Sequence, residues 1–398
     1  MSEKIKFHLD ESVDPDIAVG LSRCGVDVTT TKAEGLLGQS DLNNFSLTTP
    51  AYKATITGPG VWCRSNFPSP ENWSYHLKPE TLSEIKNAVQ EIRKQRKDLL
   101  AVTTEVFPIP SFANDAANLL KELKTGRGFV VLEGLPIDQY TYEEICTIYW
   151  AISTFFGTTL IQNVEGDLLY SVQDKGYSQE AHLSNHKIRG ADTGGSLNFH
   201  TDSAPAFQGD TPDIFGLLVL QAAKSGGESQ LISAQTLHNI ILEEHPEYLE
   251  RLYTPYHFDR RAELNPGELP TFLAPIFTYD NCLSIRYANL YILKGYEASG
   301  IPLTPADKEP IDFIQSVLQR EELAVVFKLK RGDILFINNR SILHGRTTFE
   351  DYPEPERKRY LIRIWLKNTA CRQLGSEPLV ARRYYSSVAL PLSDWLSQ

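Results

Sequence analysis

Apolar residues recur at helical spacing over three stretches in the first half of the chain. This spacing predicts helices at about 78–100, 112–123 and 142–155. A glycine follows the second and the third stretch, as is common where helices end. Between these two helices the run Phe129–Leu132 is apolar at every position and too short for a helix, so it predicts a buried strand.

The pattern changes at about residue 160, where short β-rich runs begin to alternate with turns that contain Gly, Pro or Asp. The runs predict strands at 168–172, 214–221, 229–233, 324–329, 334–337 and 360–366. Helical spacing over 236–251 and 305–320 predicts two insertions among these strands. Many short strands separated by turns are typical of a jelly roll or double-sheet β-barrel. We therefore expect a mainly β fold with flanking helices.

The first 45 residues form a separate pattern. A strand at 4–8, a helix at 15–24 and a β-branched strand at 26–30 predict a small β-α-β unit. Its segments FHLDES and GLLGQSD resemble a PIN-like toxin-type nuclease family, but this resemblance covers only about 43 residues, too few to complete such a domain. We expect an appendage at 1–45, to which we assign no activity, followed by one large domain at 46–398.

Composition and charge narrow the class of protein. The chain has 398 residues, of which 41% are hydrophobic and 22% charged, so it is not a mainly disordered protein. Its formal net charge of -11 argues against nucleic acid or an anionic membrane surface as a partner. No apolar run reaches the roughly 18 residues of a membrane span, and the N-terminus lacks the apolar core of a signal peptide. The five cysteines lie far apart and form neither a CxxC metal site nor a disulfide framework, which indicates a reducing, cytoplasmic location.

Two histidines and an aspartate are candidate metal ligands. His200 and Asp202 are two residues apart, so on an extended chain their side chains project from the same face. Taken alone, such a pair is most often a hydrogen-bonded surface pair. His344 follows a predicted buried strand and a polar turn, which would place its imidazole at a strand edge. Two histidines and one carboxylate are the ligand set of non-haem iron(II) oxygenases, which leaves positions open for a bidentate 2-oxo acid and dioxygen.

An arginine pair follows His344 along the chain. Arg359 and Arg363 are spaced so that both lie on one face of a strand and point inward. A guanidinium binds a buried carboxylate through two parallel hydrogen bonds. The alternative is a pair of surface arginines on an edge strand. The metal-ligand candidates upstream favour the inward orientation.

These motifs, in this order and spacing, resemble the taurine dioxygenase (TauD/TfdA-like) family of iron(II)- and 2-oxoglutarate-dependent oxygenases. The matching pieces are 128–134, 198–202, 226–229, 344–346 and 359–363. The resemblance implies a double-stranded β-helix, the jelly-roll core of cupin-like and clavaminate synthase-like proteins.

The resemblance also implies roles for single residues. His200, Asp202 and His344 fall at the positions of the iron ligands, and O2 and 2-oxoglutarate are the implied co-substrates. Arg359 falls where the family binds the distal carboxylate of 2-oxoglutarate. Arg363 falls where a second arginine lies near an acid group of the co-substrate or substrate. Ser229 stands where the family usually has a threonine that bonds the same distal carboxylate, and it keeps the hydroxyl group.

The implied reaction is oxidation of a small organic molecule, with hydroxylation of an unactivated C–H bond as the default. An amino acid, another carboxylate or an amine would suit Arg363 or Arg346, and succinate and CO2 would be released. Desaturation, cyclisation and demethylation stay open, and no motif identifies the substrate or the oligomeric state. The rival hypotheses are a non-catalytic β-barrel binding protein, an interaction protein built on the N-terminal unit, and a zinc hydrolase, which leaves the arginine pair unexplained.

Two further histidines, His182 and His186, lie ahead of the HxD motif with a spacing that would suit a metal site on a helix. Ser, Asn and Gly nearby favour a mobile loop instead. Of the two functional roles, a substrate contact from a lid ranks ahead of metal binding for these histidines.

Overall fold

The structure is a computed structural model, and it describes residues 6–9, 27–30, 50–95, 98–163, 165–185, 188–202, 211–261 and 269–368. The chain divides into two compact units, Met1–Leu47 and Thr48–Gln398. In the first unit β1 (Lys6–Leu9) pairs in parallel with β2 (Asp27–Thr30), and a parallel pair needs a crossover connection. The helix predicted for this connection, at 15–24, lies outside the described residues. The role of this unit as an appendage stays a prediction.

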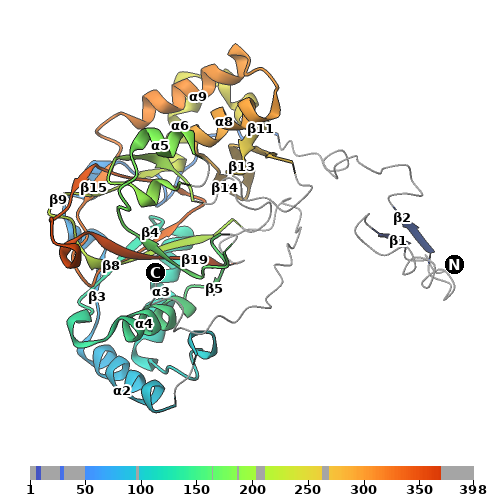
Figure 1. The fold of residues 1–398 in the computed structure, drawn as a ribbon. Coiled ribbons are helices and arrows are strands. Elements are labelled where there is room, and N and C mark those ends of the chain that lie inside the picture. The colour runs from blue at the N-terminus through green and yellow to red at the C-terminus, as the bar shows by residue number, and fades with distance from the viewer. Residues whose placement is uncertain are drawn as a thin grey trace. The chain divides into compact units, whose positions relative to one another are not determined.

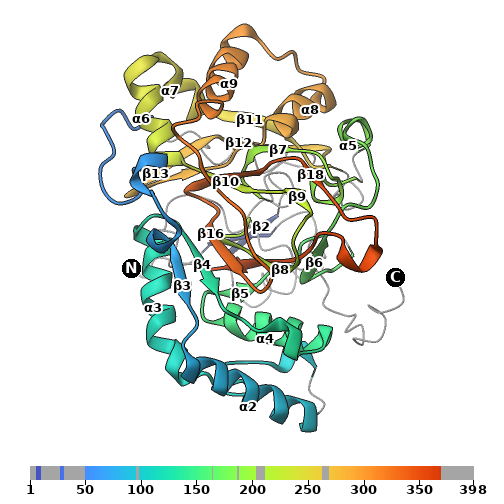
Figure 2. The ribbon, with the colours of Figure 1, turned by 90° about the vertical axis from the view of Figure 1, so that its left-hand side faces the viewer.

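The second unit is built on two sheets (Figures 1 and 2). The smaller sheet has the order β15 (Val325–Phe327), β10 (Ser229–Ser233), β17 (Ile342–Arg346), β7 (Leu197–His200). The larger sheet has the order β3 (Ser74–His76), β4 (Phe129–Glu133), β16 (Ile334–Asn338), β8 (Ile214–Gln221), β19 (Tyr360–Lys367), β5 (Thr158–Thr159), and β6 (Leu169–Val172) also pairs with β19. One buried apolar cluster joins the two sheets, with Leu231 and Ile342 from the smaller and Phe215 and Trp365 from the larger.

Alternation along the strands of the larger sheet buries both of its faces. On β16, Leu335 and Ile337 enter the cluster between the sheets, whereas Ile334 and Phe336 belong to a second cluster on the other side. Three helices pack on that outer face: α2 (Pro79–Gln95), α3 (Pro110–Thr125) and α4 (Tyr142–Thr154) (Figure 1). The double-stranded β-helix with flanking helices is therefore confirmed.

Between β10 and β15 the chain leaves the sheets and builds a helical layer with its own apolar cluster. It consists of α6 (Ala234–Glu244), α7 (Glu247–Leu252), α8 (Asn289–Ser299), α9 (Pro305–Leu318) and the hairpins β11 (Pro255–Asp259)–β12 (Thr271–Pro275) and β13 (Phe277–Asp280)–β14 (Cys282–Ile285). Figure 2 shows this layer at the opposite end of the sheets from α2, α3 and α4. A short pair, β9 (Ser225–Gly226) and β18 (Phe349–Glu350), and the helix α5 (Gln179–Ser184) complete the fold. Among the described helices, none has the length and apolar character needed to cross a membrane.

The elements agree with the periodicity in many places and differ in several others. The strands predicted at 214–221 and 229–233 have those bounds in the structure. The helix predicted at 236–251 is instead two helices, because Pro246 lacks a backbone N–H and disfavours a helical residue before it. The loop expected around His182 is wrong for 179–184, where Ser178 caps the helix α5 by accepting a hydrogen bond from the backbone N–H of Ala181. The two hairpins between α7 and α8 were not predicted.

Candidate active site

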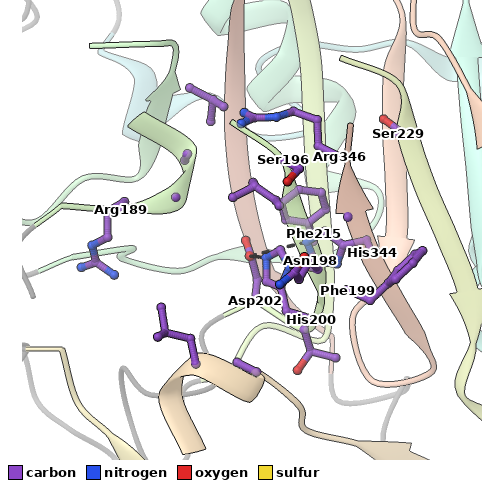
Figure 3. A pocket seen from close by; sticks show the side chains of 18 of the residues that line it. Arg189, Ser196, Asn198, Phe199, His200, Asp202, Phe215, Ser229, His344 and Arg346 are labelled. Carbon is purple, nitrogen blue, oxygen red and sulfur yellow. Dashed lines mark hydrogen bonds and ion pairs between the residues drawn. The ribbon is translucent and has the colours of Figure 1, made fainter. Parts of the chain in front are cut away.

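The three predicted metal ligands converge in the cavity between the sheets. His200 ends β7 and His344 lies on β17, and these two residues are direct partners in the antiparallel register. Asp202 follows two residues after His200. Its Oδ1 lies 3.4 Å from Nε2 of His200 and 3.5 Å from Nε2 of His344 (Figure 3). One ligand atom from each side chain fits within 4.8 Å of the others.

This donor set fits iron(II). Neighbouring ligand atoms around a first-row metal with bonds of about 2.1 Å are about 3 Å apart, close to the two distances above. The ring orientation of His200 suits the role, because its Nδ1 lies 2.8 Å from the backbone oxygen of Asn198 and leaves Nε2 to face Asp202. The ring of His344 stacks on Phe215, with 4.6 Å between the centroids. Two imidazole nitrogens and one carboxylate oxygen therefore face one point.

The protonation states suit a metal as well. Burial opposes ionisation of Asp202, but the charge of Arg363 and hydrogen bonds to the two imidazoles hold its pKa well below the usual range. Burial, together with the nearby His200, lowers the pKa of His344. Asp202 is thus a carboxylate and His344 a neutral imidazole at neutral pH, the forms that bind a cation.

The second oxygen of Asp202 is held by its surroundings. Oδ2 accepts a hydrogen bond of 2.8 Å from Nε1 of Trp365 and one of 3.2 Å from Nη1 of Arg363. The backbone N–H of Asp202 donates to Oδ1 of Asn339 at 2.8 Å. The carboxylate is therefore oriented from behind, with Oδ1 left facing the two histidines.

The two predicted arginines both line the cavity but have different partners. Arg363 is already engaged, because its Nε donates to Oε1 of Gln162 at 2.7 Å in addition to the bond to Asp202. Arg359 is 6% exposed, and its Nη1 has no hydrogen-bond partner among the described residues. Burial and the charge of Arg346 lower the pKa of Arg359 to about 9, so it remains a cation at neutral pH. Ser229 lines the same cavity. The structure thus brings all six predicted site residues to one cavity.

The cavity measures about 390 Å³, and residues that the motifs did not indicate also line it. Leu183 and His182 of α5 and Asn289 and Tyr291 of α8 form part of its wall. His182 is buried, and its Nδ1 lies 2.9 Å from the backbone oxygen of Ile188, so it is an anchored wall residue, while His186 lies outside the described residues.

Three supporting residues had no motif of their own: Trp365, Gln162 and Asn339. Only Trp365 could have been identified from the sequence, because it lies two residues after Arg363 and so shares the same face of the strand. Gln162 and Asn339 reach the site through loops, and local spacing carries no information about such contacts.

Comparisons with known proteins identify the family of the chain. The family described as "Taurine catabolism dioxygenase TauD, TfdA family" matches residues 93–365. An "FR-33289 synthase" from Streptomyces rubellomurinus is 30% identical over 343 residues, which cover 85% of this chain and 98% of that protein. A "Taurine hydroxylase-like protein SAT17" from Stachybotrys chartarum is 26% identical over 314 residues, which cover 76% of this chain and 77% of that protein.

Solved structures show the same fold. An asparagine oxygenase in complex with Fe(II), 2S,3S-3-hydroxyasparagine and succinate has a TM-score of 0.57 at 17% identity, covering 74% of this chain and 93% of that chain. The non-heme iron oxygenase OrfP in complex with Fe and alpha-ketoglutaric acid has a TM-score of 0.52 at 17% identity, with 74% and 93% covered. The family match extends over most of the chain and includes every predicted site residue. The chain therefore belongs to the TauD, TfdA family and is an iron- and 2-oxoglutarate-dependent dioxygenase that uses O2.

Proposed function

We propose that this dioxygenase hydroxylates an unactivated C–H bond of a small organic acid or amine, with conversion of 2-oxoglutarate to succinate and CO2. One observation carries the proposal: His200, Asp202 and His344 face one point in a cavity that also contains the guanidinium of Arg359, whose Nη1 has no hydrogen-bond partner among the described residues. The cavity of about 390 Å³ is sized for a small molecule beside the co-substrate.

In this proposal His200, Asp202 and His344 hold the iron. Iron(II), when bound, supplies the activation of O2 that is coupled to decarboxylation of the 2-oxo acid. Arg363 favours the ionised form of Asp202, and the hydrogen bonds from Trp365 and Arg363 turn its other oxygen toward the two imidazoles. The apolar side chains around the site, such as Phe215 and Leu231, exclude water from the reacting groups.

Arg359 and Ser229 are assigned to the distal carboxylate of 2-oxoglutarate. A buried guanidinium with a free N–H is costly until an anion reaches it, and a carboxylate accepts two parallel hydrogen bonds from such a group. Arg363 is assigned to the metal end of the co-substrate, because its guanidinium already lies at Asp202.

The substrate class is proposed from the relatives. One solved neighbour contains 3-hydroxyasparagine and another contains (3S)-hydroxy-L-Arg, and a curated relative is called taurine hydroxylase-like. An amino acid or another small carboxylate or amine is the corresponding proposal here. Membership of a dioxygenase family argues against the two non-enzymatic rivals and the zinc hydrolase.

We also propose that residues 1–45 are an appendage and that the protein works in a reducing cytoplasm. Cys63 and Cys146 form no disulfide with another described residue, and a reducing compartment preserves such thiols. The acidic net charge supports a small molecule, and not nucleic acid, as the partner.

The experiment follows succinate release by wild-type protein with iron(II) and 2-oxoglutarate as the sample is switched from anaerobic to aerobic conditions. A panel of amino acids, other carboxylates and amines is screened for faster release and for a product that is 16 mass units heavier. Oxygen-dependent succinate that needs iron is expected. Equal signals with and without iron would contradict the proposed reaction.

A further inference from the structure

Arg346 lies beside the proposed site, and the proposed function leaves it without a role. It follows His344 by two residues on β17, so the two side chains share a face. Its direct partner across the antiparallel pair with β10 is Ser229, which is assigned to the co-substrate. Both Arg346 and Ser229 line the cavity (Figure 3).

The guanidinium of Arg346 is buried, and only part of it is bonded. The residue is 5% exposed, and its Nη2 donates to the backbone oxygens of Thr193, at 2.8 Å, and Gly195. Its Nε and Nη1 have no partner among the described residues. Leaving N–H groups of a buried cation unpaired is costly, and the cost falls when an anion occupies the site.

Arg346 keeps its charge at neutral pH. Burial lowers its pKa to about 10, while the nearby carboxylates of Asp174 and Asp351 act in the opposite direction. Among the described residues, Nη2 of Arg346 bonds only backbone oxygens, and its Nε and Nη1 bond neither carboxylate. These two carboxylates therefore leave its Nε and Nη1 available.

Arg359 is a second cation close to Arg346. The guanidinium carbons of Arg346 and Arg359 lie 4.7 and 5.0 Å from the ring centroid of Phe349. The charge of Arg346 makes ionisation of Arg359 less favourable, so the two repel each other. Arg363 differs from both, because Asp202 and Gln162 already occupy it. Two buried guanidiniums with unpaired N–H groups are thus held near one aromatic ring.

We propose that Arg346 is a second receptor for an acid group in this cavity, beside Arg359. The ligand chemistry is a carboxylate or similar oxyanion. It comes either from 2-oxoglutarate, whose distal carboxylate both arginines would share, or from the organic substrate. This inference rests on the proposed function, and it makes Arg346 a determinant of which acids the cavity accepts.

The test measures binding without turnover. Protein loaded with Mn²⁺ is titrated anaerobically with 2-oxoglutarate and with 2-oxopentanoate, which lacks the distal carboxylate. Protein saturated with 2-oxoglutarate is then titrated with phosphate, sulfate and acetate. The variants are Arg346→Gln, which keeps an N–H donor for the carbonyls of Thr193 and Gly195, and Arg346→Lys, which keeps the charge. Arg127→Gln is the matched control, because Arg127 also bonds a backbone oxygen but does not line the cavity.

If the acid group belongs to the co-substrate, Arg346→Gln should raise the Kd of 2-oxoglutarate about tenfold or more and leave that of 2-oxopentanoate within about twofold. If the acid group belongs to the substrate, Arg346→Gln should leave the Kd of 2-oxoglutarate unchanged. The variant saturated with 2-oxoglutarate should then no longer bind phosphate, sulfate or acetate. Arg346→Lys should lie between wild type and Arg346→Gln in either case.

Two results would show that Arg346 only stabilises the segment 193–195. In the first, Arg346→Gln raises the Kd of both 2-oxo acids equally. In the second, it leaves the affinity for every anion unchanged while lowering the melting temperature. Either result overturns the proposal. Failure of the proposed function would look different, because wild-type protein would then release no succinate with iron and O2 whatever the binding data.

Discussion

The indole Nε1 of Trp365 donates a hydrogen bond of 2.8 Å to Oδ2 of Asp202, whose other oxygen faces the two histidines. The indole is buried between the sheets, so it has little freedom to move. A fixed donor behind a carboxylate ligand sets which oxygen the metal meets.

Trp365→Phe should therefore weaken metal binding by about 10–100-fold, the usual effect of losing a residue that supports a ligand. Anaerobic titration with iron(II) measures it. Trp150→Phe is the matched control, because the Trp150 indole is also buried but donates to the backbone oxygen of Val102 at 3.1 Å, far from the ligands. Equal iron affinity in the two variants would mean that the bond to Asp202 does not orient the ligand.

Substitution of a proposed ligand should have a larger effect. His200→Ala removes one of three donors, so both bound iron and succinate release should fall to background. Metal analysis after dialysis measures the first, and a turnover assay the second. His76→Ala, at an exposed histidine on β3, should change neither. Stoichiometric iron in the His200 variant would rule out this ligand set.

The assignment of Arg359 predicts a change in co-substrate affinity. Arg359→Lys keeps the charge but loses the two-pronged geometry, so the Kd of 2-oxoglutarate should rise about tenfold or more. Ser229→Ala should give a smaller rise, since it removes one neutral donor. A titration curve for Arg359→Lys that overlays the wild type would transfer the role to Arg363 or Arg346.

His238 should make stability depend on pH. It is fully buried and bonded to the Tyr253 hydroxyl at 3.0 Å, and burial lowers its pKa to about 4, from about 6.5 in the unfolded chain. The unfolded state therefore binds the proton more readily. The stability that comes from burying neutral His238 is fully present above about pH 6.5. It is lost as the pH falls toward 4, which lowers the free energy of unfolding by up to about 3 kcal/mol.

Urea unfolding at several pH values measures this slope. His238→Asn should be less stable at pH 7 and should show a shallower decline in the free energy of unfolding between pH 6.5 and 4. Parallel declines in the variant and the wild type would assign the pH dependence to other groups.

Removal of the N-terminal unit should leave the site intact. All the proposed iron and co-substrate residues belong to the second unit, Thr48–Gln398. A protein that begins near Leu47 should bind iron and convert 2-oxoglutarate without substrate, with some loss of stability. Loss of iron binding on this truncation would contradict the appendage hypothesis, as would nuclease activity of the full chain that disappears with the segment.

Local spacing along the chain was enough for much of the fold and for parts of the site. The bounds of β8 follow from its apolar run, because a strand buried on both faces is apolar at nearly every position, and the bounds of β10 follow from a short β-rich run. The pairing of His200 with Asp202, and of Arg359 with Arg363, follows from the two-residue period of an extended chain. The resemblance of these motifs to a known family then supplied their chemistry.

Only the tertiary structure decided which distant residues meet. His344 stands opposite His200 because β17 and β7 pair in that register, and register depends on how the two sheets pack, which local periodicity does not contain. The pairing of β17 with β10, also distant in the sequence, places Arg346 across from Ser229. The hydrogen bond from Trp365 to Asp202 likewise joins a residue of β19 to one just beyond the end of β7. The sequence determines which residues of a strand share a face, but long-range packing determines which strands lie side by side. The site consists of residues from strands that are distant in the sequence, so only the tertiary structure could show it.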